Sequence, residues 1–378
     1  MIRGVWSFFG RLCRIGLSYW SFLWSFVRRH FCRLLARLRP AVSDDDAAER
    51  NDGNRGPSPG CQEEVERGPE RQSTARQPDC ETQSSKEGED VELDATDELY
   101  CPYDSTWENK GPGPRTDRKP RRAAGFRSSK FARFEQAARD MQNYRHGYPS
   151  QIRRQVFNQD SQADKPNLEF HLGMRPCLPD GIYIQDFHNN WHREYDTLEY
   201  VHTYIQWLFP LPEPGMNVQA PTLTKAEIQE FLSNSTAKEN LLKSYELMLD
   251  FYGITLCDKE TGAVSRASNW RNRFNNLNSN THNNLRITRI LKCLGTLGFP
   301  HYQFPLVQFF LNETLVKGEL PRVKDSVLNY FVFAVLDKRD RRHLLKFAYL
   351  NYVPKDEFVW CPKKIQRMWS REEIQCRE

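Results

Sequence analysis

The ten cysteines of this sequence form no CxxC pair, and no spacing between them repeats. A structural zinc site needs ligands at short, recognisable spacings, and a disulfide framework belongs to a much smaller, cysteine-dense chain. These absences exclude the zinc-ribbon and disulfide-rich secreted classes. They favour a protein of a reducing compartment.

Catalytic motifs are also lacking. The sequence has no glycine-rich phosphate loop, no GxSxG elbow, no HExxH motif and no kinase signature. No nucleophile or acid stands at a recognisable spacing from a base. We therefore expect a protein that is not an enzyme and that takes neither a cofactor nor a metal ion.

Acidic residues are missing from residues 1–40, which carry eight arginines. Residues 41–114, by contrast, carry 7 basic and 20 acidic side chains, although the net charge of the whole chain is only +5. Such segregation predicts either contact of the basic parts with an anionic surface or a solvated acidic tail.

Residues 1–40 also lack a long apolar run, because the uncharged stretch 15–27 is shorter than the roughly 20 residues of a spanning helix. Tryptophan, phenylalanine and arginine surround it, which favours the headgroup region of an anionic membrane. We interpret this segment as a candidate membrane anchor. A signal peptide, for which no small-x-small cleavage site follows, and a segment without a membrane role are the alternatives.

Residues 41–130 have few apolar side chains and many Gly, Pro, Ser and Gln residues, so we expect a disordered acidic linker. Within it, Tyr103–Glu108 is an apolar island and a candidate docking peptide. The linker also holds a basic cluster of nuclear-import type, formed by Arg118, Lys119, Arg121 and Arg122.

Helical periodicity dominates residues 131–362, and we expect a single all-α domain of about eight to ten helices joined by short loops. Thr224 and Glu227 form a capping box, and Gly253 ends a helix that carries the face Leu241–Tyr252. Alternation at Leu168, Phe170 and Leu172 predicts a short extended piece. Residues 363–378 are expected to be a short tail.

The stretch Trp191–Pro210 is the densest aromatic run of this domain. Leu198, Val201, Ile205 and Leu208 recur at helical spacing, which predicts one buried helix stopped by Pro210. The same stretch carries polar side chains among its rings.

Several motifs in this order resemble the opioid growth factor receptor family. They are Leu198-Glu199-x-x-His202-x-Tyr204-Ile205-Gln206-Trp207-Leu208-Phe209-Pro210, Tyr144-Arg145-His146-x-Tyr148-Pro149, Tyr245–Ile254, His282–Lys292 and Phe358-Val359-Trp360. The resemblance covers roughly residues 140–362 and implies a receptor for opioid growth factor, the pentapeptide Met-enkephalin, acting in negative regulation of cell growth. It also implies association with the nucleus and perinuclear membranes. With residues 1–40 as a membrane contact and the basic cluster as a signal for an import receptor, we expect a membrane-associated, perinuclear or cytoplasmic chain with nuclear entry.

The resemblance does not assign the residues that hold the peptide. A Tyr-Gly-Gly-Phe-Met ligand needs aromatic surfaces, an acid for its amino terminus and a cation for its carboxylate. As candidates we take Trp191, Glu199, His202, Gln206 and Trp207. The alternative is that Trp207 and His202 are buried core residues.

A different class of function stays open at this point. The chain could be an intracellular helical scaffold or adaptor that binds protein or nucleic acid, since Arg286, Arg289 and Lys292 could form a basic face. A solvated helix face explains the same residues, so the sequence does not favour nucleic acid.

Overall fold

The computed structural model describes residues 96–107, 128–146 and 164–375. These ranges belong to one compact unit that spans residues 82–378. The candidate membrane anchor in residues 1–40 and the basic import cluster at residues 118–122 lie outside the described residues.

The described chain is helical apart from one short hairpin, which confirms the all-α prediction. Its first helices are α2 (Ser129–Arg145), α4 (Pro166–His171), α5 (Ile184–Asn190), α6 (Tyr195–Tyr200), α7 (Ile205–Leu208), α8 (Lys225–Ser233) and α9 (Ser235–Tyr252). Strands β1 (Ile254–Leu256) and β2 (Val264–Arg266) then pair antiparallel, with Thr255 opposite Ser265.

The second half continues with α10 (Trp270–Ser279), α11 (Asn283–Thr296), a 3-10 turn at Pro300–Tyr302 and α12 (Gln303–Leu311). Two π-helical turns follow, at Asn312–Val316 and Val327–Phe331, and they flank α13 (Lys324–Ser326). The chain ends with α14 (Val332–Ala334), α15 (Lys338–Asn351), a 3-10 turn at Lys355–Glu357 and α16 (Lys363–Gln375).

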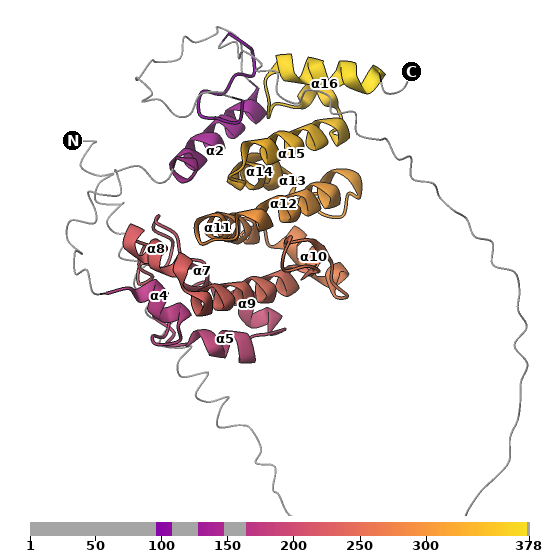
Figure 1. The fold of residues 1–378 in the computed structure, drawn as a ribbon. Helices are drawn as coiled ribbons and strands as arrows, with labels where there is room; N and C mark the ends of the chain where they lie inside the picture. The colour runs from indigo at the N-terminus through magenta and orange to yellow at the C-terminus, as the bar shows by residue number, and fades with distance from the viewer. Residues whose placement is uncertain (1–95, 108–127, 147–163, 376–378) are drawn as a thin grey trace, which may run out of the picture. The chain divides into compact units, whose positions relative to one another are not determined.

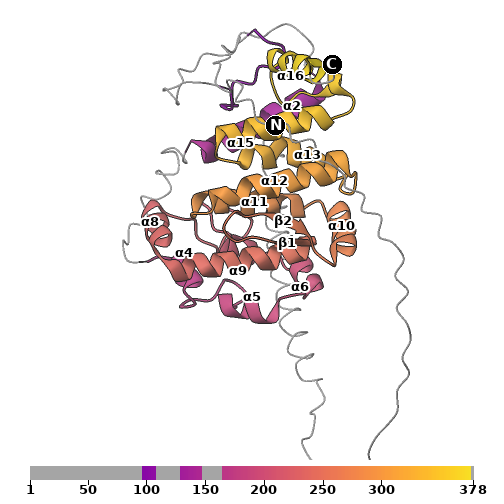
Figure 2. The ribbon, with the colours of Figure 1, turned by 45° about the vertical axis from the view of Figure 1, so that its right-hand side comes forward.

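The helices of this unit are stacked in rows. In both views α9, α11, α12, α15 and α16 follow one another, with α5 on the far side of α9 (Figure 1, Figure 2). Helices α4, α5, α8 and α10 pack on α9, whereas α2 packs on the π-helical turn Val327–Phe331 and on α14. The packing therefore runs from row to row through the whole unit.

Aromatic side chains fill the core between the rows. Trp207, Tyr204, Phe170 and Phe187 are almost fully buried, and the Phe170 ring centroid lies 5.5 Å from that of Trp207. Each such ring removes about 150–250 Å² from water, so these contacts dominate the packing energy.

Two local signals in the sequence are confirmed. The Thr224 hydroxyl accepts the Glu227 amide while the Glu227 carboxylate accepts the Thr224 amide, which is the predicted capping box. Helix α9 ends at Gly253, whose φ of 78° lies in the left-handed region that glycine adopts without strain.

The single helix predicted for Trp191–Pro210 is wrong. The chain there ends α5, forms α6, leaves the helical conformation at Val201 and resumes as the short α7. The four stripe residues Leu198, Val201, Ile205 and Leu208 are all buried, as expected. Leu198 belongs to α6, Ile205 and Leu208 belong to α7, and Val201 lies in the break between them. Periodicity predicted their burial and not the break between them.

The extended piece predicted at Leu168–Leu172 is also wrong, because Pro166–His171 forms α4. Pro166 occupies the first helical turn, where its missing amide has no cost. The next amides, of Asn167 and Leu168, donate to the buried Glu227 carboxylate. A capping group from another helix thus decides the local conformation.

The packed part of the chain is longer at both ends than the predicted domain 131–362. Residues 96–107, which fall within the predicted linker, pack against α2, α15 and α16, and we call them the N-terminal clasp. Residues 363–375, expected as a tail, form α16, which buries Ile365, Gln366 and Trp369. In the ranges that the structure describes, no helix combines the length and the apolarity needed to cross a bilayer.

Candidate functional site

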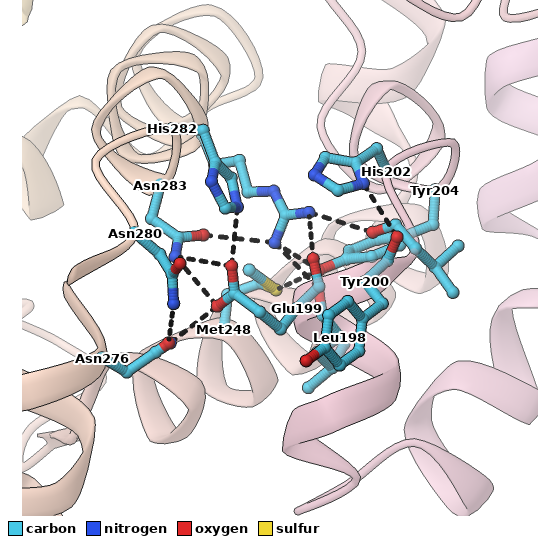
Figure 3. Close-up of polar contacts among 12 residues, drawn as sticks. Leu198, Glu199, Tyr200, His202, Tyr204, Met248, Asn276, Asn280, His282 and Asn283 are labelled. Carbon is cyan, nitrogen blue, oxygen red and sulfur yellow. Dashed lines mark hydrogen bonds and ion pairs between the residues drawn. The ribbon is translucent and has the colours of Figure 1, made fainter.

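A polar network forms where α6 meets the end of α10 and the start of α11 (Figure 3). At its centre is the carboxylate of Glu199, whose side chain is 13% exposed. It accepts hydrogen bonds from the amide nitrogens of Asn276, at 2.6 Å, and Asn283, at 3.1 Å. These bonds hold the carboxylate in one orientation at the edge of the core.

Arg286 fixes the chain on which Glu199 lies. Its buried guanidinium donates to the carbonyl oxygens of Leu198, at 2.8 Å, and Val201, at 2.9 Å. These carbonyls lie where α6 ends, and the last carbonyls of a helix have no intrahelical donor. The Tyr204 hydroxyl also donates to the Leu198 carbonyl, at 2.9 Å. Arg286 and Tyr204 together therefore satisfy the backbone where the helix breaks.

Two histidines lie beside the carboxylate. Nε2 of His282 is 2.7 Å from a Glu199 oxygen, although without the alignment of a hydrogen bond, and the ring centroid of His202 is 5.1 Å from that of His282. Burial lowers the pKa of His282, and the charges of Arg286 and His202 act in the same direction against the effect of Glu199. The lowered pKa favours the uncharged form of His282 beside Glu199.

The rim of the site carries exposed aromatic and imidazole rings. Tyr200 is 79% exposed, and His202 is exposed with its Nδ1 2.9 Å from the Tyr200 carbonyl oxygen. In the described chain, His282 is the one basic side chain within ion-pair distance of the Glu199 carboxylate, because the nearby Arg286 binds backbone carbonyls instead. A fixed anion without a lysine or arginine partner, next to exposed rings, is suited to bind an ammonium group.

The five candidate residues differ in their exposure and in their contact with this network. Glu199 and His202 lie together in the network, and His202 is exposed rather than a core residue. Trp207 is 1% exposed and donates its indole N–H to the Leu178 carbonyl, so it is a core residue. Gln206 is buried as well.

Trp191 is half-buried at the end of α5, where its ring packs on those of Phe187 and Tyr204. It packs behind α6 through these ring contacts and is not part of the network around Glu199. The polar residues of the network that the candidate set missed are Asn276, Asn283, His282 and Arg286. Three of them lie in the family-like run His282–Lys292, which was the available signal.

Comparison with known proteins bears on residues 160–367. They match the model of the opioid growth factor receptor (OGFr) conserved region, which is more than half of the chain. No solved structure matches the chain.

Named relatives agree with that match. The opioid growth factor receptor of Mus musculus is 51% identical over 242 residues, which are 63% of this chain and 37% of the relative. The receptor of Homo sapiens is 52% identical over 232 residues, 61% of this chain and 34% of the relative. Opioid growth factor receptor-like protein 1 of Mus musculus is 49% identical over 230 residues, 60% of this chain and 48% of the relative.

The matched part of this chain thus spans about a third to a half of the length of these relatives. The receptors and the receptor-like protein share almost the same sequence identity with this chain. Because the family model covers more than half of the sequence and the relatives match at about 50% identity, this chain belongs to the opioid growth factor receptor family.

Proposed function

We propose that this chain is a non-enzymatic receptor for opioid growth factor, the pentapeptide Met-enkephalin, and that it acts in negative regulation of cell growth. Support comes from relatives named opioid growth factor receptor at about 50% identity. The network around Glu199 offers a chemical group that such a peptide requires.

The observation that carries the proposed site is the charge of Glu199. The carboxylate is oriented by Asn276 and Asn283, and its ion-pair partner among the described residues is a histidine whose pKa is lowered. A peptide ammonium in this place would donate a charge-assisted hydrogen bond to the Glu199 carboxylate, worth roughly 1.5–3 kcal/mol. The exposed rings of Tyr200 and His202 would lie beside the peptide's own aromatic residues.

The test replaces Glu199 by glutamine, which keeps the shape and the amide contacts but removes the charge. We expect Glu199→Gln to weaken binding of labelled Met-enkephalin by about 10- to 100-fold, the equivalent of one charge-assisted bond. Equilibrium binding to the full chain measures the effect. Glu230→Gln, which alters an exposed acid of α8 paired with Lys165, is the matched control and should change little.

A second peptide separates a lost charge pair from a damaged fold. Met-enkephalin acetylated at its amino terminus has no ammonium, so it should bind the unaltered chain as weakly as the normal peptide binds Glu199→Gln. The variant itself should bind both peptides within about threefold of each other. If acetylation weakens binding to the variant as much as to the unaltered chain, Glu199 does not hold the ammonium.

The proposal extends to location. We place the chain at membranes near the nucleus and in the cytoplasm, with nuclear entry, on the basis of the basic aromatic segment 1–40 and the import-type cluster at Arg118, Lys119, Arg121 and Arg122. Imaging of the tagged full chain beside a chain without residues 1–40 tests this placement. Unchanged membrane association after the deletion would contradict the role of the segment as an anchor.

A further inference from the structure

A polar cleft lies between α16 and the turn that follows α15, at the end of the helical stack where α16 is found (Figure 1). Its volume is about 330 Å³. The cations that line it are Lys355, Lys363, Arg367 and Arg371, and Asp356 is its acid. Four basic residues and one acidic residue therefore line the cleft, which makes its lining positively charged.

Three of these cations form one row on α16. Lys363, Arg367 and Arg371 are four residues apart and so share one face of the helix. In the described part of the chain none of the three forms an ion pair. The two acids of this helix are paired elsewhere, Glu372 with Lys346 and Glu373 with Lys355.

Like charges at this spacing oppose helix formation, by roughly 0.2–0.5 kcal/mol for each pair. Among the residues that line the cleft, Asp356 is the one acid that can offset the repulsion within the row. A ligand that carries several negative charges would offset the rest.

The floor of the cleft is held by hydrogen bonds. The Tyr349 and Ser370 hydroxyl oxygens are 2.6 Å apart, and the buried Gln366 amide donates to the carbonyls of Phe358 and Cys361 at 2.9 Å each. Ser370 also donates to the Gln366 carbonyl. These bonds tie α16 to the preceding turn, so the row of cations is positioned by the core.

We propose that this cleft binds a small polyphosphorylated ligand of the inositol polyphosphate class, either free or as a lipid headgroup. Guanidinium groups form paired hydrogen bonds with phosphate, and Lys363 adds a mobile point charge. The volume is in the range of small-molecule sites. Four of the eight lining residues are cations, which favours a ligand that carries several phosphate groups over a phosphopeptide that carries one.

The test uses the full chain and inositol hexakisphosphate as the probe. We expect binding measured by calorimetry, together with reduced hydrogen exchange in residues 349–357 and 363–375. The variant Lys363→Gln, Arg367→Gln, Arg371→Gln should bind at least tenfold more weakly and lose this protection. Its three side chains are partly or fully exposed, so the change leaves the core intact.

The control removes three exposed cations elsewhere, through Lys225→Gln, Arg322→Gln and Arg339→Gln. It has the same net charge as the cleft variant and the same basic segment 1–40, and it should bind and be protected like the unaltered chain. Equal loss in both variants, or protection outside the cleft, overturns the proposal. Binding of a phosphoserine peptide without binding of the probe does so too.

The source of the phosphate groups is resolved by a last comparison. Vesicles that contain phosphatidylinositol 4,5-bisphosphate are sedimented with the chain and with both variants. A cleft-dependent loss of sedimentation identifies the lipid headgroup, whereas cleft-dependent binding of the free probe alone identifies a free ligand. The proposal does not depend on the peptide site, because Glu199→Gln should leave this binding unchanged.

Discussion

Arg286 and Glu227 show how single buried charges decide local conformation in this fold. The Arg286 guanidinium binds carbonyls where α6 ends, and the Glu227 carboxylate binds amides where α4 begins. In both places the helix terminus lacks intrahelical partners, and the side chain of a distant helix supplies them. Each charge is satisfied by backbone groups rather than by an opposite charge.

The two charges differ in what they do for the surface. Glu227 is 1% exposed and every oxygen of its carboxylate has a partner, so it is structural. Glu199, which Arg286 positions, keeps an exposed edge and a histidine neighbour. Glu227 is thus a helix cap and Glu199 a candidate ligand site, and what separates them is how much of each carboxylate is exposed to solvent.

At the scale of elements, the N-terminal clasp adds a connection between α2 and the last helices to the direct packing of α2 on α14. The Asp104 carboxylate accepts from Arg145 of α2 at 3.2 Å, and both side chains are less than 5% exposed. The Thr106 hydroxyl accepts from Arg341 of α15 at 3.0 Å, and Trp107 packs on Trp369 of α16, with ring centroids 5.7 Å apart. The clasp therefore contacts three helices through buried groups.

We predict that Asp104→Ala destabilises the chain by roughly 3–5 kcal/mol, because it leaves the Arg145 guanidinium buried without its anion. Urea denaturation that reports the free energy of unfolding measures the change. The matched control is Asp140→Ala, which removes an exposed acid bonded to Gln136 and should cost less than about 0.5 kcal/mol. Equal, small effects of the two changes would mean that the clasp is not part of the cooperative unit.

The sequence predicted the elements whose signals are local. The capping box at Thr224, the left-handed Gly253 and the burial of the stripe Leu198–Leu208 follow from neighbours a few residues apart. The break after Tyr200 and the helix at Pro166–His171 could not be predicted, because their partners lie 88 and 60 positions away. Helix α16 was missed because only Ile365, Gln366 and Trp369 of its polar sequence are buried.

The candidate site was predictable to the same extent. The mixture of polar groups and rings in one turn singled out Glu199 and His202, whereas their neighbours Asn276 and His282 come from other parts of the chain and were not singled out. Trp207 and Gln206 were proposed on the same ground and are buried, since a ring with a polar atom looks the same in a core as in a site. Long-range packing decides between the two.

At the scale of the whole molecule, buried histidines connect stability to pH. His171 is fully buried between α4 and α8, with its ring centroid 5.0 Å from that of Phe231 and its nitrogens directed at the carbonyls of Asn167 and Leu208. Burial lowers its pKa to about 4, and burial together with the charge of Lys243 lowers the pKa of His188 to about 4 as well. Both are therefore neutral in the folded chain over a range in which the unfolded chain is protonated.

The sign of the effect follows from proton uptake. The ordinary pKa of histidine is about 6.5, so below this pH the unfolded chain binds a proton at each of these positions. The folded chain binds these protons only when the pH falls to about 4. Acid therefore favours unfolding, and stability is lost as the pH falls through this window. Each proton contributes a slope of about 1.4 kcal/mol per pH unit.

We therefore predict that His171→Gln reduces the slope of unfolding free energy against pH, between about pH 5 and 6.5, by about one proton. Urea denaturation at closely spaced pH values measures it, and the slope rather than the absolute stability is the readout, since the substitution also disturbs packing. The control is Phe231→Leu, which disturbs the packing beside the His171 ring without removing an imidazole and should leave the slope unchanged. If both variants keep the slope of the unaltered chain, His171 titrates alike in the folded and unfolded states, and the pH dependence of this fold must come from its carboxylates instead.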